Sequence, residues 1–211
     1  MLVAEWMTRD VVAVAPGDMI STAARILGKR RIRQVPVAEG QCLVGLLTKS
    51  DLLRACPPDL NPFSLIGRVA TELARPIRDI MTTEVVTARP DSPLEEAAHQ
   101  LIDRRINALP VVANLRLAGI LTGSDISRAL LAALGAGTPG VRITFDVAAT
   151  EDVFALVSAL ATKHAARVHN VTTFEHEGRH VAIVRLDQEV PAMVEELWQS
   201  GHRVSSVARF S

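Results

Sequence analysis

The sequence predicts an α+β chain in which a duplicated βαββα unit is followed by a βαββαβ domain. Two observations carry this prediction: an internal repeat at a spacing of 74 positions, from Met7 to Met81, and a change of pattern after a glycine-rich segment near residue 135. The boundaries that we expect are 1–55 for the first repeat, 56–76 for a spacer, 77–134 for the second repeat, 135–140 for a linker and 141–211 for the last domain.

The composition argues against several classes of protein. The 23 basic and 23 acidic residues give a formal net charge of zero, so no nucleic acid and no membrane surface is expected as a partner. Aromatic residues make up 3% of the chain, which disfavours base-stacking platforms. A signal peptide and a long apolar run are both missing from the sequence, and we expect a cytoplasmic protein. Cys42 and Cys56 are expected to be reduced thiols.

The repeat is specific because three motifs recur in the same order without a gap. The motifs are Met-Thr, Arg-Arg-Ile followed by Pro-Val, and Gly-x-Leu-Thr-x-Ser-Asp. In the two copies they stand at Met7-Thr8 and Met81-Thr82, at 30–37 and 104–111, and at 45–51 and 119–125. A match of this kind indicates a duplication.

Each copy predicts the order strand, helix, strand, strand, helix. Short β-rich runs at 11–14 and 85–87 are the expected first strands. Apolar residues at i, i+3, i+4 and i+7 predict that the first helices face a sheet. They are Ile20, Ala23, Ala24 and Leu27 in one copy and Leu94, Ala97, Ala98 and Leu101 in the other.

The ends of the helices are also marked. Ser92, Pro93 and Glu95 predict an N-cap, a first helical residue and a capping box for the first helix of the second copy. The last helices are expected to open at 48–51 and 122–125. In the spacer, residues 61–73 predict a short amphipathic helix that braces one repeat against its neighbour or against a partner subunit.

These motifs closely resemble the CBS-domain family, in which two repeats pack into one Bateman module. The resemblance implies a regulatory protein, not an enzyme, that binds an adenosine-containing ligand such as AMP, ADP or ATP in clefts between the repeats. By this resemblance the aspartates accept ribose hydroxyls, the threonines contact ribose or phosphate, backbone of the first strand flanks the base, and the arginines contact phosphate. The implied ligand-binding residues are Val12, Ala13, Arg31, Pro36, Thr48 and Asp51, and their counterparts Val86, Thr87, Arg105, Pro110, Thr122 and Asp125.

Physical chemistry is compatible with these roles but leaves alternatives open. A helix N-terminus attracts anions, arginine offers a permanently charged fork, and an ionised aspartate accepts two hydroxyls. Thr-x-x-Asp is also a capping box in its own right, and each Arg-Arg pair could be a solvated helix end. Three differences between the copies bear on the clefts: Ala13 against Thr87, Lys49 against Gly123, and Arg33-Gln34 against Asn107-Ala108. We therefore expect a more positive first cleft and two clefts that are not equivalent.

The last seventy residues predict a strand, helix, hairpin, helix and strand. Residues 141–147 alternate between apolar and polar, Thr150 is the expected cap of the next helix, and Glu177-Gly178 marks a hairpin. A second amphipathic helix is expected to use Val190, Met193, Val194, Leu197 and Trp198 as its apolar face.

This order is similar to that of the ACT domain, a ferredoxin-like module that senses amino acids or dimerises through its sheet. The first strand–helix turn, residues 146–150, lacks the glycine that effector-binding ACT domains usually carry, so a structural or dimerising role is favoured. The combination of two CBS repeats and an ACT domain resembles the bacterial acetoin-utilisation regulatory proteins, which implies regulation of carbon metabolism.

The resulting functional hypothesis is a homodimeric sensor that needs no cofactor, takes an adenine nucleotide as its regulatory ligand and acts on an unidentified target enzyme. The alternative is a ligand-free dimeric interaction scaffold. A metalloenzyme is disfavoured, although five of the six histidines lie in the last domain, because no cysteine or carboxylate set completes a metal site. No nucleophile motif and no Walker loop is present in the sequence.

Overall fold

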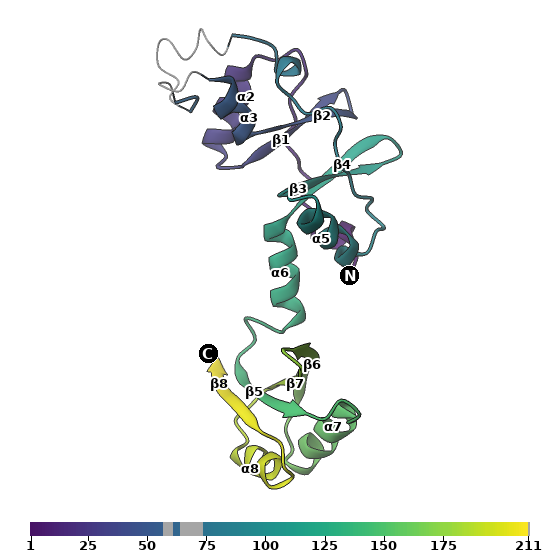
Figure 1. Cartoon of the computed structure of the whole chain (residues 1–211), viewed down its shortest axis with the longest axis vertical. Helices are drawn as coiled ribbons and strands as arrows, with labels where there is room; N and C mark the ends of the chain where they lie inside the picture. The colour runs from purple at the N-terminus through teal and green to yellow at the C-terminus, as the bar shows by residue number, and fades with distance from the viewer. Residues whose placement is uncertain (57–60, 64–73, 211) are drawn as a thin grey trace. The chain divides into compact units, whose positions relative to one another are not determined.

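The computed structural model describes residues 1–56, 61–63 and 74–210 (Figure 1). The chain divides into two compact units, Met1–Ser127 and Arg128–Ser211. The helix expected in the spacer lies almost wholly outside the described residues. Within those residues, no helix has the length and apolarity to cross a bilayer.

The first unit contains both repeats, and corresponding elements appear in each. Its elements are α1 (Val3–Trp6), α2 (Ile20–Lys29), β1 (Gln34–Glu39), β2 (Cys42–Thr48), α3 (Lys49–Ala55), η1 (Ile77–Asp79), α5 (Leu94–Asp103), β3 (Ala108–Ala113), β4 (Arg116–Thr122) and α6 (Gly123–Ala133), the last of which continues into the second unit. The pairs β1–β2 and β3–β4 are antiparallel, and each shifts register at the equivalent place, between Val37 and Ala38 and between Val111 and Val112.

Neither expected first strand is formed. One isolated parallel bridge stands in each copy, Val14 with Val37 and Ala88 with Val111, and Ala88 lies one residue beyond the expected range 85–87. Val14 donates to the Pro36 carbonyl and accepts from Ala38. Extending this parallel ladder by two residues would require a proline N–H, from Pro36, to donate to the carbonyl of Val12, and proline has none. Pro110 stands at the equivalent place in the second copy. The sequence pattern alone therefore predicted strands that the prolines do not allow.

The segment preceding each repeat lies on the other repeat. Thr8 exchanges two backbone hydrogen bonds of 2.9 Å with Ile120 on β4, and Thr82 exchanges two of 2.9 Å with Leu46 on β2. The two repeats are thus joined crosswise, and each Met-Thr motif contacts the partner copy.

The predicted apolar faces of the first helices are confirmed. Ile20, Ala23, Ala24 and Leu27 of α2 are buried; on α5 Leu94, Ala97 and Leu101 are buried and Ala98 is half-buried. The predicted Ser92 cap is wrong, because α5 begins at Leu94 after Pro93 without a side-chain cap. The first N–H of this helix instead donates to the Met1 carbonyl at 3.0 Å.

The second unit has the predicted βαββαβ order. Within residues 140–210, the strands form one antiparallel sheet in the order β6-β7-β5-β8, which is the ferredoxin-like order. The elements are β5 (Gly140–Val147), α7 (Val153–Lys163), β6 (Val168–His176), β7 (Arg179–Leu186), α8 (Pro191–Gln199) and β8 (Val204–Phe210). The hairpin turn has the two positive φ angles of a type I′ turn, 52° at Glu177 and 73° at Gly178.

Two details of this unit differ from expectation. Asp152, not Thr150, caps α7 by accepting a hydrogen bond of 3.0 Å from the Ala155 N–H. Trp198 was expected on the apolar face of α8 but is 62% exposed, whereas Met193 and Leu197 are buried.

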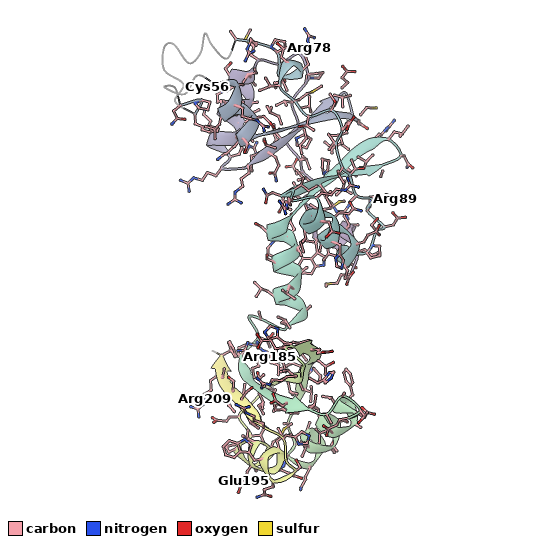
Figure 2. All side chains as sticks on the ribbon, viewed as in Figure 1. Cys56, Arg78, Arg89, Arg185, Glu195 and Arg209 are labelled. Atoms are coloured by element: carbon pink, nitrogen blue, oxygen red, sulfur yellow. The ribbon has the colours of Figure 1, made fainter. Side chains whose placement is uncertain are left out.

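A buried arginine also marks this unit. Arg185 (Figure 2) is 3% exposed, donates to the Thr138 carbonyl and lies 4.5 Å from the centre of the Phe210 ring. Elsewhere in the chain, Cys42 is exposed, Cys56 is buried and no disulfide joins them.

Candidate functional site

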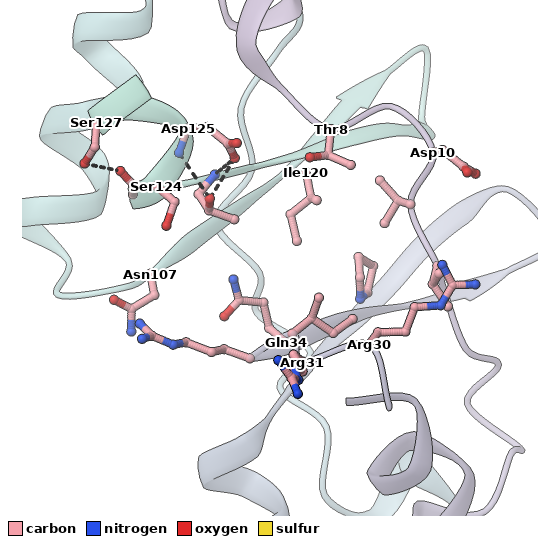
Figure 3. Close-up of a pocket in the computed structure, with 17 residues that line it drawn as sticks. Thr8, Asp10, Arg30, Arg31, Gln34, Asn107, Ile120, Ser124, Asp125 and Ser127 are labelled. Atoms are coloured by element: carbon pink, nitrogen blue, oxygen red, sulfur yellow. Dashed lines mark hydrogen bonds between the residues drawn. The ribbon is translucent and has the colours of Figure 1, made fainter. Parts of the chain in front are cut away.

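A cavity of about 680 Å³ lies in the first unit and is lined by both repeats (Figure 3). This volume is in the range of small-molecule sites. The first repeat contributes Thr8, Asp10, Val11, Val12, Arg30, Arg31, Ile32, Arg33, Gln34 and Pro36. The second repeat contributes Asn107, Ile120, Thr122, Gly123, Ser124, Asp125 and Ser127. We call it the Asp125 cavity.

The Asp125 cavity brings together five of the twelve residues that the sequence predicted. Val12, Arg31 and Pro36 come from the first copy, and Thr122 and Asp125 come from the second. The other seven lie outside it: Ala13, Thr48, Asp51, Val86, Thr87, Arg105 and Pro110. The crosswise join of the repeats explains this grouping, because the segment that carries Val12 follows Thr8, which is bonded to β4.

Asp125 lies in the first turn of α6 and is 3% exposed. Its Oδ2 accepts hydrogen bonds of 2.7 Å from both the backbone N–H and the hydroxyl of Thr122. The carboxylate is therefore part of a capping box and at the same time lines the cavity. The structural and the ligand-binding interpretations of Thr-x-x-Asp are compatible at this position.

Asp51 makes the same capping box in the first copy. Its Oδ2 accepts from the Thr48 N–H at 2.8 Å and from the Thr48 hydroxyl at 2.7 Å, and its Oδ1 accepts from the Arg54 guanidinium. It lines a separate cavity of about 390 Å³ with Arg54, Ala55, Arg75 and Ile80. A bound anion there would meet guanidinium groups, but the Asp51 carboxylate already holds one of them.

The side of the Asp125 cavity that belongs to the first repeat carries Arg30, Arg31 and Arg33. All three are exposed, and within the described residues no side chain hydrogen bond or ion pair engages them. Arg31 has a φ of 54°, as does Arg105 in the second copy. Both residues follow a helix end in the left-handed conformation that glycine usually supplies. Arg31 and Arg105 thus stand at exposed helix ends, which was the alternative interpretation of the Arg-Arg pairs. Arg31 in addition lines the cavity.

The sequence did not single out several residues that line the cavity. Thr8 was recognised as part of a repeated motif but not as a cavity residue, and Asp10, Gln34, Asn107, Ser124 and Ser127 were not assigned a role. Arg30 and Arg33 were noted only as neighbours and as differences between the copies. Their closeness to Arg31 in the sequence was the signal that could have identified them as cavity residues. That they share a cavity with Asp125 depends on the crosswise join of the repeats.

Two histidines of the second unit, His164 and His202, each contact one carboxylate at hydrogen-bond distance. The distance from His164 Nε2 to Glu196 Oε2 is 2.9 Å, and that from His202 Nε2 to Glu151 Oε1 is 2.8 Å. Hydrogen bonds from Lys163 and then His164 lower the pKa of the Glu196 carboxyl below its ordinary value. In the part of the chain that the structure describes, no three His, Cys, Asp or Glu side chains converge as a metal site.

A smaller cavity, of about 280 Å³, lies at the first strand–helix turn of the second unit. It is lined by residues of that turn together with Thr173, Phe174, Glu175 and His180. This is the turn in which the sequence lacks the glycine of effector-binding ACT domains.

Comparison with known proteins covers mainly the first unit. The uncharacterised protein MJ1225 of Methanocaldococcus jannaschii is 32% identical over 125 residues, 58% of this chain and 44% of that protein. Homoserine O-acetyltransferase of Methanohalobium evestigatum is 35% identical over 128 residues, 60% of this chain and 23% of the enzyme. The chain therefore spans less than half the length of these two relatives.

Several solved structures are similar to the same region. A Vibrio cholerae protein assigned to acetoin utilization (AcuB) has a TM-score of 0.55 and 26% identity, over 64% of this chain and 93% of that one. The CBS domain pair of MJ0100, in complex with 5′-methylthioadenosine and S-adenosyl-L-methionine, has a TM-score of 0.51 and 29% identity, over 62% and 99%. CBSX2 in complex with AMP has a TM-score of 0.53 and 27% identity, over 62% and 96%.

The family model described as the CBS domain matches residues 3–57 and 77–132, which is more than half of the chain. The two matches coincide with the two copies of the repeat and include every residue that lines the Asp125 cavity. This chain belongs to the CBS-domain family and carries a tandem pair of such domains, a Bateman module.

Proposed function

We propose that this chain is a non-catalytic regulatory protein that binds an adenosine-containing ligand in the Asp125 cavity. The observation that carries the proposal is the convergence of Asp125 and Thr122 from one repeat with Val12 and Arg31 from the other on one cavity of about 680 Å³. The structures of MJ0100 and CBSX2, which hold adenosine compounds, support this choice of ligand class.

Each part of such a ligand has a chemically suitable partner. The Asp125 carboxylate accepts ribose hydroxyls, which are paired donors at close spacing. The adenine base lies against the Val12 backbone. Pro36 has no N–H to donate to the Val12 carbonyl, so the parallel strand pairing does not extend to this residue. The phosphate lies toward the arginines of the first repeat, because a guanidinium binds phosphate through two parallel hydrogen bonds.

The test measures ligand binding to the full chain. We expect millimolar AMP, ADP or ATP to raise the unfolding midpoint, since a ligand that binds only the folded state stabilises it by about 2.7 kcal/mol at one hundred times its Kd. Titration calorimetry then gives the affinity and the stoichiometry. If AMP, ADP, ATP and S-adenosylmethionine all leave the midpoint unchanged, the proposal is wrong and a ligand-free dimeric scaffold is favoured.

The matched variants are Asp125→Ala and Asp51→Ala. Both remove a capping carboxylate with the same two contacts to a threonine, so both lower stability to a similar extent. Only Asp125→Ala removes a group from the Asp125 cavity. We expect it to abolish binding there, while Asp51→Ala retains that binding.

For the second unit we propose an ACT-like role in dimerisation or effector response. The ferredoxin-like strand order supports the ACT comparison, and the similarity to AcuB supports a place in carbon, or acetoin, metabolism, with a cytoplasmic target enzyme. Light scattering of the full chain tests the homodimer, which a monomeric mass would contradict. The predicted boundaries at 56, 77, 135 and 141 are part of the same proposal and are tested by limited proteolysis.

A further inference from the structure

We infer that the Asp125 cavity selects nucleotides by the length of the phosphate chain and prefers a nucleoside di- or triphosphate to a monophosphate or to a phosphate-free adenosine compound. This inference rests on the proposed function and adds the class of ligand. It is drawn from the charges on the cavity wall and from the comparison of the two copies within this chain.

The charges lie on opposite sides of the cavity. Figure 3 shows Ser124 and Asp125 on one side of the open space and Arg30 and Arg31 on the other. Arg33 also lines the first-repeat side. Three guanidinium groups exceed what one monoester phosphate requires, because a single bidentate fork already pairs two of its oxygens. An extended phosphate chain would engage the remaining cations.

The same wall disfavours other adenosine compounds. S-adenosylmethionine carries a sulfonium cation, which would be repelled by the three arginines, and 5′-methylthioadenosine has no anionic group to pair with them. Among the residues that line the cavity, the acidic side chains are Asp10 and Asp125. Against the three guanidinium groups, these two carboxylates leave the cavity lining with a net positive charge.

The backbone at Arg31 sets the point from which its side chain extends. Arg31 adopts a left-handed φ of 54°, a conformation that is strained for a residue with a β-carbon and that glycine adopts without strain. Arg105 has the same φ of 54° at the equivalent position, so this conformation belongs to the helix end that both copies share. The fixed backbone limits where the Arg31 guanidinium can reach.

The duplication identifies which arginine is specific to this cavity. Arg30 and Arg31 recur as Arg104 and Arg105, but Asn107 stands at the position equivalent to Arg33. Arg33 is therefore the extra cation, and Arg33→Asn introduces the side chain that the second copy already carries. Because the Arg33 side chain is exposed, replacing it removes no core packing, and the variant is expected to fold.

The experiment is calorimetric titration of the full chain with AMP, ADP, ATP and 5′-methylthioadenosine, for the wild type, for Arg33→Asn and for Arg116→Asn. Arg116 is an exposed arginine on β4 outside the cavity, so its substitution removes the same charge elsewhere. We expect ATP to bind at least about tenfold more tightly than AMP. This ratio of affinities corresponds to the contribution of one charge-assisted hydrogen bond. Arg33→Asn should lower the ATP affinity about tenfold and the AMP affinity less than about twofold, and Arg116→Asn should change neither.

The outcomes separate this inference from the proposed function. If AMP and ATP bind equally, if 5′-methylthioadenosine binds most tightly, or if Arg33→Asn weakens AMP and ATP alike, the inference is wrong and the adenosine site stands. If no adenosine compound binds, the proposed function is wrong and the inference is overturned with it.

Discussion

The thioether sulfur of Met7 lies 2.7 Å from the point that a β-carbon on Gly119 would occupy. Met81 has the same relationship, also at 2.7 Å, to Gly45. Each repeated methionine therefore packs against the repeated glycine of the other copy. Two of the three recurring sequence motifs are explained by this contact, which places the segment before each repeat on the strand of its partner.

Gly119→Ala is expected to destabilise the first unit. The added β-carbon would meet the Met7 sulfur at 2.7 Å and the Thr8 carbonyl oxygen at 2.9 Å, and the carbonyl belongs to a hydrogen-bonded bridge that cannot move freely. Overpacking of this kind costs about 1–3 kcal/mol, to be measured by urea unfolding.

The control is Gly28→Ala. Gly28 lies within α2 and nothing lies within 4 Å of its added β-carbon, so alanine should raise stability by up to about 1 kcal/mol through helix propensity. A Gly119→Ala chain that unfolds at the wild-type urea concentration would show that the packing against Met7 is loose.

Much of the fold could be predicted because its signals are local. The stripe from Ile20 to Leu27 and the Glu177-Gly178 turn depend only on nearby residues, and the recurrence of whole motifs is visible when the two copies are aligned. Which residues share the site depends on long-range contacts. That Arg31 shares a cavity with Asp125 rather than with Asp51 follows from the Thr8–Ile120 bridge, a long-range contact that no local pattern specifies.

Local patterns also failed where a second contact replaced the local one. Ser92 has the sequence of an N-cap, but the first N–H of α5 is bonded to the Met1 carbonyl. Residues 11–14 have strand composition, but Pro36 lacks the donor that a longer ladder needs. In the first case the group that replaces the cap, the Met1 carbonyl, is distant in sequence. In the second case the deciding feature is the missing N–H of a proline on another segment, which a hydrophobic pattern does not reveal.

Leu115→Gly is expected to stabilise the chain. The β3–β4 hairpin turns at Asn114 and Leu115 with φ angles of 50° and 64°, and the Leu115 side chain is 82% exposed. Asn-Gly is the preferred pair for such a turn, so removing the left-handed strain should gain about 0.5–1 kcal/mol after the entropy cost of glycine. Leu115→Ala is the control for lost apolar surface, and an equal gain in that variant would contradict the backbone explanation.

Asp51→Ala is expected to cost more stability than Arg54→Ala. Asp51 is 6% exposed and accepts from both the N–H and the hydroxyl of Thr48. Its removal therefore deletes part of a helix cap and leaves the half-buried Thr48 N–H unpaired, at about 1–2 kcal/mol. The Arg54 side chain is 77% exposed, so its ion pair with Asp51 is screened by solvent and is worth about 1 kcal/mol or less. Equal losses in urea unfolding would show that the ion pair, not the cap, stabilises the start of α3.

Glu196→Gln is expected to reduce the acid sensitivity of the second unit. Hydrogen bonds from Lys163, at 2.7 Å, and from His164 lower the pKa of the Glu196 carboxyl in the folded chain. A group with a lowered folded pKa binds fewer protons in the folded state than in the unfolded state, so its stabilisation is complete above the ordinary carboxylate pKa. That stabilisation is lost as the pH falls through the lowered pKa.

The measurement is the urea midpoint between pH 7 and pH 3. The wild-type midpoint should fall more steeply than that of Glu196→Gln in the acid range, because the variant has no carboxylate to protonate at this position. Glu195→Gln is the matched control, since the Glu195 carboxylate accepts from the neutral amide of Gln199 at 3.4 Å rather than from a cation. If Glu195→Gln and Glu196→Gln change the acid limb equally, the pairing with Lys163 and His164 has no part in the acid response.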